Sequence, residues 1–553
     1  MKVVSFLVGT AVSLVATVTY AAELETDKAP TKAPEVKVCS LYGEGFYQIP
    51  GQGDICIRIG ATARLDGGFR ADGDGGPFIG TGADARNHIA TRDFLGQARG
   101  TVWADAREIT QYGVLKIYVS GGIDGSTGVS GSGTATAFWK RGYINFAGAT
   151  IGKTQSFFDF LNGAFSYGAY HLGGGSNTYN NGTLLAAYTY DFGLGISATA
   201  SIEDSHTRRN ALWDAGTNVL AIGSFPGPNG AFWIGSTACD TALVTPDAAP
   251  GVVPANVNGC PIGDYATSWT PDPVVNLRLD QGWGSGQVAA ALHQVHAGDY
   301  GNDVSSLASG GPGAFTGQAP SDKWGFALMG GVMVYVPTGE NDKVWANIVY
   351  SQGAVAYTGL SQFGSFGTFS RFNGGSVGAA WALDGVFANT VGPNSAALSG
   401  SGIQLTSAWS IGLAYEHHWN EQVRSSVFGV LTDVTYPGAA KSIFCSSPVG
   451  PVRNAAGMAP NFATGPVAGC NPDFAVWGLG TRTVWNPIKN VDLGAELMYS
   501  RLDQNMGAGV LLNFAGTSGV PAGNYTPQNQ SIWSGLLRAQ WHFGAPPTEE
   551  SRS

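Results

Sequence analysis

Segments in which apolar and polar residues alternate constrain the fold of this chain more than any other feature. From residue 57 to residue 70 the odd positions are apolar or small, whereas Arg58, Arg64 and Asp66 occupy even positions. A period of two over this length indicates a β-strand with one apolar and one polar face. Sixteen strands are expected, near residues 57–67, 97–107, 112–120, 137–147, 149–155, 184–192, 194–203, 274–282, 287–297, 324–336, 343–352, 405–418, 422–434, 473–484, 491–502 and 530–543.

The connections between these strands alternate in length from the first strand to the last. Short turns such as Gly148, Gly193 and the segment WNPIKN alternate with long segments rich in Gly, Pro, Ser and Asn. Outer-membrane barrels combine short periplasmic turns with long external loops, and their sheet must close because hydrocarbon offers no hydrogen-bond partners. We therefore expect an all-β fold, a 16-stranded antiparallel transmembrane β-barrel, with its apolar face toward lipid and its polar face lining a lumen.

The composition agrees with a large β structure. The 82 glycines among 553 residues are about twice the usual share. Charged residues make up only 12% of the chain. The net charge of −10, without any basic stretch interleaved with aromatics, argues against a nucleic-acid partner.

The N-terminus predicts export. Residues 1–21 have the layout of a secretory signal peptide, with Lys2, an apolar run, and small residues around a cleavage position near Ala21. The apolar run is shorter than the ~20 residues that a spanning helix needs. We expect residues 22–38 to be a flexible lead-in, residues 39–543 to form the barrel, and residues 544–553 to form a C-terminal tail.

Six cysteines fall into three pairs that are local in sequence. In an oxidising compartment disulfides persist, so nearest-neighbour pairing is the simplest expectation. Metal sites usually show CxxC spacing or histidines at matching offsets, and the sequence has neither. We therefore expect no metal or other cofactor and three local disulfides, Cys39–Cys56, Cys239–Cys260 and Cys445–Cys470.

Six long segments, spread over nearly the whole chain, resemble the porins of alphaproteobacteria, especially those of the rhizobial type. In order they are VKVCSLYGEGFYQIPGQGDICIRIG, DAREITQYGVLKIY, INFAGATIGKTQSFFDF, PDPVVNLRLDQGWGSGQVAAALH, WSIGLAYEHHWN and WNPIKNVDLGAELMYSRLDQ. The resemblance implies an outer-membrane channel for passive diffusion of small hydrophilic solutes and ions. It also implies a homotrimer surrounded by outer-membrane lipid and lipopolysaccharide.

The same resemblance implies that the third external loop folds inward and narrows the pore. That loop corresponds to about residues 156–182, which include Asp159 and His171 and form the third long connection. We expect Phe157, Phe158 and Phe160 to pack against the inner wall.

Parity along the strands selects the side chains opposite this loop. Arg58 and Arg64 share one face of a strand but lie roughly 20 Å apart at ~3.3 Å per residue, so they cannot both lie at one constriction. The excess of inward cations predicts a modest preference for anions. The expected pore-lining residues are Arg58, Arg64, Arg99, Asp105, Arg107, Lys116, Arg141 and Arg278, with Arg424 as a further candidate.

Two other functions compete with that of a general porin. A substrate-specific outer-membrane channel would look almost identical in sequence and stays open as an alternative. A barrel enzyme needs a nucleophile beside a base. Because strand neighbours face opposite ways, His417 cannot act together with His418, nor His293 with His296. We therefore expect no catalytic activity.

Overall fold

The computed structural model describes residues 38–49, 54–71, 76–77, 94–126, 134–160, 165–175, 178, 182–215, 265, 270–298, 319–360, 368–388, 400–448, 450–514 and 521–544. The expected signal peptide, residues 22–37 of the lead-in, Cys239, Cys260 and residues 545–553 lie outside this part. Within it, no helix is both long and apolar enough to cross a membrane.

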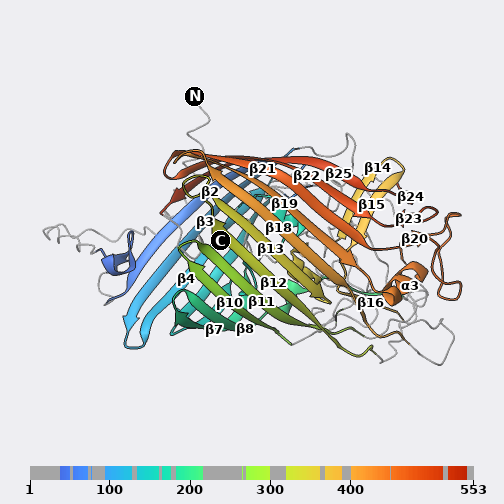
Figure 1. Cartoon of the computed structure of the whole chain (residues 1–553), viewed down its shortest axis with the longest axis horizontal. Coiled ribbons are helices and arrows are strands. Elements are labelled where there is room, and N and C mark those ends of the chain that lie inside the picture. Colours follow the sequence, from blue (N-terminus) through green and yellow to red (C-terminus); the bar gives the residue numbers. More distant parts are fainter. Residues whose placement is uncertain are drawn as a thin grey trace, which may run out of the picture.

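Sixteen antiparallel strands form one closed barrel, and this confirms the predicted fold class (Figure 1). Each strand pairs with its neighbours along the chain, and β2 also pairs with β25, so the ring of strands closes. The barrel strands are β2 (Cys56–Phe69), β3 (Phe94–Thr110), β4 (Gly113–Ser126), β5 (Thr134–Phe146), β6 (Ala149–Thr154), β7 (Thr183–Gly193), β8 (Ile196–Glu203), β10 (Asp272–Gln281), β11 (Gly284–Val295), β12 (Lys323–Tyr335), β13 (Lys343–Gln352), β18 (Ser407–His418), β19 (Val423–Thr435), β21 (Phe474–Ile488), β22 (Val491–Gln504) and β25 (Gln530–Phe543).

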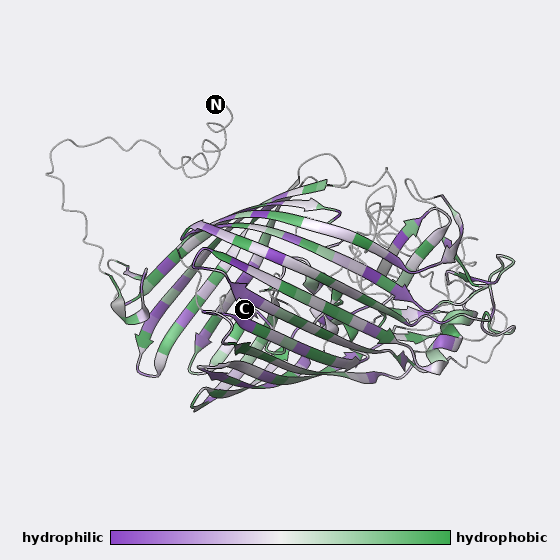
Figure 2. Ribbon diagram, turned by 45° about the horizontal axis from the view of Figure 1, so that its top comes forward, coloured by the Kyte–Doolittle hydropathy of each residue, from purple (hydrophilic) through white to green (hydrophobic). Residues whose placement is uncertain are grey.

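The outer face of the barrel is apolar. On β2, Leu65 is 61% exposed while its neighbour Asp66 is 1% exposed, and the alternation of hydrophobic and hydrophilic residues recurs along the strands in Figure 2. Exposed Ile151 on β6 and Leu277 on β10 continue this surface around the barrel. A closed sheet with this band of side chains suits surrounding hydrocarbon.

One connection differs from the expected alternation. The link between β4 and β5 comprises only residues 127–133, the same span as the turn 336–342 between β12 and β13. The link is short because β4 ends later, and β5 begins earlier, than the apolar pattern indicates. The second half of β4 is rich in glycine, which hides the alternation, although its pairing with β3 continues to Ser126.

The long connections gather at one end of the barrel, which we call the loop end; the opposite end is the turn end (Figure 1). They form two further sheets and a helix that the sequence did not predict. Trp213, Trp381 and Phe444 pack there, with ring centroids 5.1 and 5.4 Å from Phe444. These elements are β9 (Leu212–Asp214), β14 (Thr368–Asn373), β15 (Ser376–Trp381), β16 (Gly385–Phe387), β17 (Gln404–Leu405), α3 (Gly438–Ser446), β20 (Val452–Arg453), β23 (Leu511–Phe514) and β24 (Gly523–Pro527).

A disulfide-linked hairpin lies at the turn end, just before β2. Strand β1 (Tyr47–Gln48) pairs with the first two residues of β2, whereas β25 pairs with β2 only from Ala61 onward. The hairpin therefore covers a stretch of β2 that the last strand leaves open. Disulfides join Cys39 to Cys56 here and Cys445 to Cys470 at the loop end.

Candidate pore and its inward loop

One level of the inner face of β2, β3, β4 and β25 is rich in charge, and we call this set the charged wall: Arg64, Asp66, Arg99, Asp124 and Arg538. Asp66 forms ion pairs with Arg64 on its own strand and with Arg538 on β25, each at 2.7 Å. Arg99 lies opposite Arg64 in register and binds Asp124 on β4 at 2.5 Å. Every carboxylate in this group is therefore held by at least one guanidinium.

A second charged cluster lies nearer the turn end. Asp105, fully buried, binds Arg107 at 2.8 Å and lies 3.9 Å from Arg58. Both arginines stack on Phe46 of the N-terminal hairpin, 4.8 and 5.0 Å from its ring centroid. Lys116 lies opposite Arg107 in register. The two charged levels are thus separate, as the strand spacing predicted, and only the level of Arg64 and Arg99 belongs to the charged wall.

The inner face of β10–β13 and β18 has a different character, and we call it the apolar wall. Its side chains are buried although they point into the barrel, because other segments of the chain cover them. Trp345 and Val349, 6% and 0% exposed, are typical. The other apolar members are Val274, Ala289, Ala291, Ala327, Met329, Ala408 and Ala414.

The connection after β6, residues 155–182, is one of these covering segments, which we call the inward loop. Its described residues touch strands far apart around the barrel. Gln287 on β11 donates to the backbone carbonyls of Phe157, Phe158 and Asp159. Across the barrel, the Glu496 carboxylate on β22 accepts the backbone N–H groups of residues 167 and 168 at 2.5 and 2.9 Å. The inward loop is thus hydrogen-bonded to two well-separated strands of the barrel, β11 and β22.

Apolar contacts and close approach hold the inward loop in place as well. Phe158 and Phe160 are buried in the main apolar cluster, as expected. A Cβ on Gly331 would lie 2.3 Å from the Phe160 ring, and one on Gly494 would lie 2.1 Å from the Tyr167 hydroxyl. Glycine at these two wall positions therefore lets the inward loop pack directly on the strand backbone. Tyr167 in turn stacks on Arg538 at 4.0 Å.

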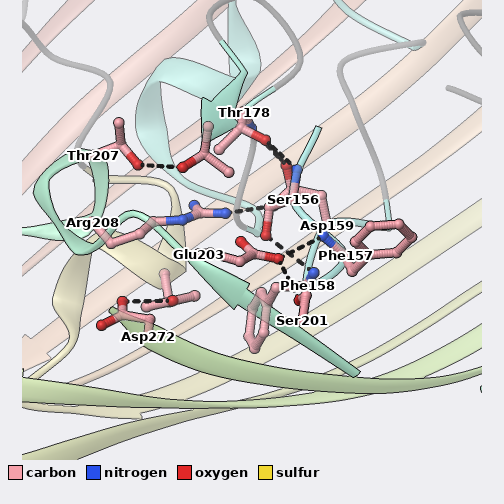
Figure 3. Close-up of polar contacts among 12 residues, drawn as sticks. Ser156, Phe157, Phe158, Asp159, Thr178, Ser201, Glu203, Thr207, Arg208 and Asp272 are labelled. Atoms are coloured by element: carbon pink, nitrogen blue, oxygen red, sulfur yellow. Dashed lines mark hydrogen bonds and ion pairs between the residues drawn. The ribbon is translucent and has the colours of Figure 1, made fainter. Parts of the chain in front are cut away.

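The base of the inward loop forms a closed neck (Figure 3). Asp159 accepts from both the backbone N–H and the hydroxyl of Thr178, at 2.6 and 2.8 Å, while Ser156 N–H donates to the same hydroxyl. Glu203 at the end of β8 accepts the Phe157 N–H at 3.0 Å. The start and the end of the loop are therefore joined to each other and to the barrel rim.

A second long connection, after β13, packs against the inward loop. Gly175 N–H donates to the Thr358 carbonyl. Its buried Asp384 accepts from the backbone N–H groups of Asn210 and Val355 and from the Tyr265 hydroxyl. Burial raises the pKa of Asp384 to about 6. This carboxylate therefore joins the connection after β8 to the connection after β13 and forms one plug with them over the apolar wall.

Not all of the predicted pore residues lie together. Arg141 abuts Gly182 at the end of the inward loop, and His171 is buried against Tyr170. Arg278 binds Asp280 and faces the Phe160 ring at 5.5 Å. Asp159 is buried in the neck. Of the candidates, only Arg64 and Arg99 therefore belong to the charged wall.

Sequence reasoning missed several charged residues of the lumen. The same strand parity would have found Asp66, Asp124 and Arg538, because each alternates with outward apolar residues. Glu496 and Arg482 follow the same rule on their strands, where they lie opposite each other in register. Their pairing with the inward loop has no sequence signal.

The histidine pairs behave as strand parity predicted. His417 contacts buried Asp342 in the 336–342 turn, whereas His418 lies 3.4 Å from Glu416. His293 is buried and contacts Asp272, whereas His296 contacts Asp322. Hydrogen bonds to Asp342 lower the pKa of that carboxyl below its usual value despite its burial.

Comparison with known proteins gives one family. The sequence profile of a porin subfamily matches residues 27–536. Porin Omp2b of Brucella canis is 28% identical over 221 residues, covering 37% of this chain and 54% of that protein, and porin Omp2b of Brucella melitensis shows the same values. The match thus spans about half the length of these relatives.

A solved structure shares the fold. The outer membrane channel DcaP of Acinetobacter baumannii superposes with a TM-score of 0.51 at 12% identity, covering 89% of this chain and 98% of that one. At this identity the likeness concerns the fold alone. With the profile match over most of its length and the closed barrel, the chain belongs to the porin subfamily and is located in the outer membrane.

Proposed function

We propose that the protein is a porin channel for passive diffusion of small hydrophilic solutes and ions, with its open path along the charged wall. The observation that carries this proposal is the contrast within one barrel. Plugging segments bury the apolar wall, whereas the side chains of Arg64, Arg99 and Asp124 stay 13%, 18% and 19% exposed. The inward loop, which reaches Arg538 through Tyr167, narrows this path.

Planar bilayers test this proposal with the purified mature protein. We expect stable, ohmic conductance in potassium chloride that appears in triple steps, because we also propose a homotrimer embedded in outer-membrane lipid and lipopolysaccharide. A protein that inserts but does not conduct would contradict the channel. Conductance in single steps would contradict the trimer only.

The same measurement addresses selectivity. Cations outnumber carboxylates both in the charged wall and in the cluster of Arg58, Asp105, Arg107 and Lys116, and fixed charges along a water-filled path bias ion entry. We propose a modest preference for anions. A reversal potential showing cation selectivity in a salt gradient would reject it.

A substrate-specific channel is the second candidate. The paired guanidinium groups of the charged wall are suited to bind carboxylate or phosphate groups of a solute. Block of the potassium chloride current by one small organic anion, at concentrations where similar anions have no effect, would favour this candidate. The porin family supports a channel without catalytic activity in either case.

A further inference from the structure

Arg208, in the connection after β8, has a position that the proposed channel does not by itself explain. It ends the short helical turn Ser205–Arg208, and its side chain is only 1% exposed. Its guanidinium donates to the Asp159 carboxylate of the inward loop at 3.0 Å (Figure 3). The connection after β8 thus places a buried cation at the base of the inward loop.

The Asp159 carboxylate is the point at which the neck closes. One of its oxygens binds Thr178 near the end of the inward loop, and the other binds Arg208. Arg208 is therefore bonded to the residue that joins the two arms of the loop. A buried carboxylate without a cation is costly, so the neck depends on this partner.

Arg208 also touches the connection after β13. Its guanidinium lies 4.6 Å from the centroid of the buried Tyr357 ring, which contacts Phe158 edge-on at 4.7 Å. The Tyr357 hydroxyl donates to Asp272 on β10 at 2.8 Å, which fixes the ring against the wall. Three connections and one barrel strand thus meet around a single side chain.

The charge of Arg208 is secure in this site. Burial disfavours the guanidinium cation, but the charges of Asp159, Tyr357 and Glu203 outweigh burial and raise the pKa of Arg208. The guanidinium of Arg208 is therefore a cation where it contacts Asp159.

We propose that Arg208 is a positioning residue of the pore: it holds the neck of the inward loop, so the connection after β8 sets the conductance and size limit of the channel. This inference rests on the proposed channel function. Without Arg208, the buried Asp159 loses this guanidinium, the neck admits water, and the inward loop leaves its place in the lumen. The path along the charged wall then widens and fluctuates.

Arg208→Met, which removes the charge and keeps the length, tests the proposal in the full chain. We expect single-channel conductance to rise about 1.5- to 2-fold with added current noise, because conductance follows the width of the constriction. Liposome swelling should show entry of larger sugars. Arg208→Lys should restore most of the wild-type values. The matched control is Arg501→Ala, which removes a partly exposed ion pair with Asp503 at the loop end and should change neither readout.

The outcomes separate this inference from the channel itself. A wild-type protein that does not conduct would overturn the proposed function. A conducting wild type and a folded Arg208→Met with the same conductance and size limit would overturn the role of Arg208. If Arg208→Met does not fold, the double variant Asp159→Asn/Arg208→Met removes both charges and decides the question. Wild-type conductance and size limit in the double variant would then reject the proposal.

Discussion

The charged wall and the apolar wall belong to one barrel, yet they differ in what lies against them. The charged wall faces the proposed water path, so its strands alternate apolar residues outside with ion-paired residues inside. The apolar wall faces the inward loop and the connection after β13. On β12, exposed Leu328 lies between buried Ala327 and Met329, so both faces of the strand are apolar. The polarity of inward-facing residues therefore depends on whether water or other protein segments lie against them. Lipid determines only the outward-facing residues.

The strongest way to break this comparison is to put a charge on the apolar wall. Val349→Lys places an ammonium group where the side chain is 0% exposed. We expect a loss of about 3–5 kcal/mol in the free energy of unfolding, typical of an uncompensated buried charge. Urea unfolding of the refolded barrel, followed by tryptophan fluorescence, measures it. Thr62→Lys, inward-facing on β2, is the matched control and should cost far less. Equal losses in both variants would show that the two walls do not differ.

Removing an anchor of the inward loop should have the next largest effect. Glu496→Ala leaves two buried backbone N–H groups of the loop without their acceptor, and each such group costs about 1–3 kcal/mol. We expect lower thermal stability and faster proteolysis of the inward loop. Glu496→Gln keeps one accepting oxygen, so its stability and proteolysis rate should lie between those of the wild type and Glu496→Ala. Unchanged proteolysis in Glu496→Ala would mean that other contacts suffice to hold the loop.

A smaller change tests the close approach of the loop to the wall. In Gly494→Ala the new methyl group overlaps the Tyr167 hydroxyl, so the ring must move off Arg538, at about 1–3 kcal/mol for overpacking. Bilayer recordings should show altered conductance together with a modest fall in melting temperature. Gly330→Ala is the control, since its nearest neighbour is Ile348 at 3.8 Å. Identical recordings for both variants would contradict the contact.

The smallest structural effect is expected on the charged wall itself. The double variant Arg64→Gln/Arg99→Gln removes two partly exposed cations and should change stability by only about 1 kcal/mol. The reversal potential should nevertheless move toward cation selectivity, because Asp66 and Asp124 remain. No shift in the reversal potential would place the ion path away from this wall.

Much of the barrel could be predicted because its signals are local. Alternation locates each strand, and the spacing of the cysteines predicted the disulfide Cys39–Cys56 just before the first strand. The prediction failed where the local signal is weak, as in the glycine-rich end of β4. It also could not assign the site fully, since parity places Arg64, Arg58 and Arg278 on the same face of the sheet. In the structure Arg58 lies nearer the turn end, against Phe46, and Arg278 lies on β10 against Phe160, so neither belongs to the charged wall.

The sequence by itself determined the closed sixteen-stranded barrel, its apolar exterior and the polar parity of its lumen. These properties follow from a period of two and from the need to pair every backbone group in hydrocarbon. Only the tertiary structure decided which part of the lumen is filled. The bonds that decide it, from Arg208 to Asp159 and from Glu496 to the inward loop, join residues 49 and more than 300 positions apart. No local pattern encodes such partners, because they depend on how the whole chain folds back into its own barrel.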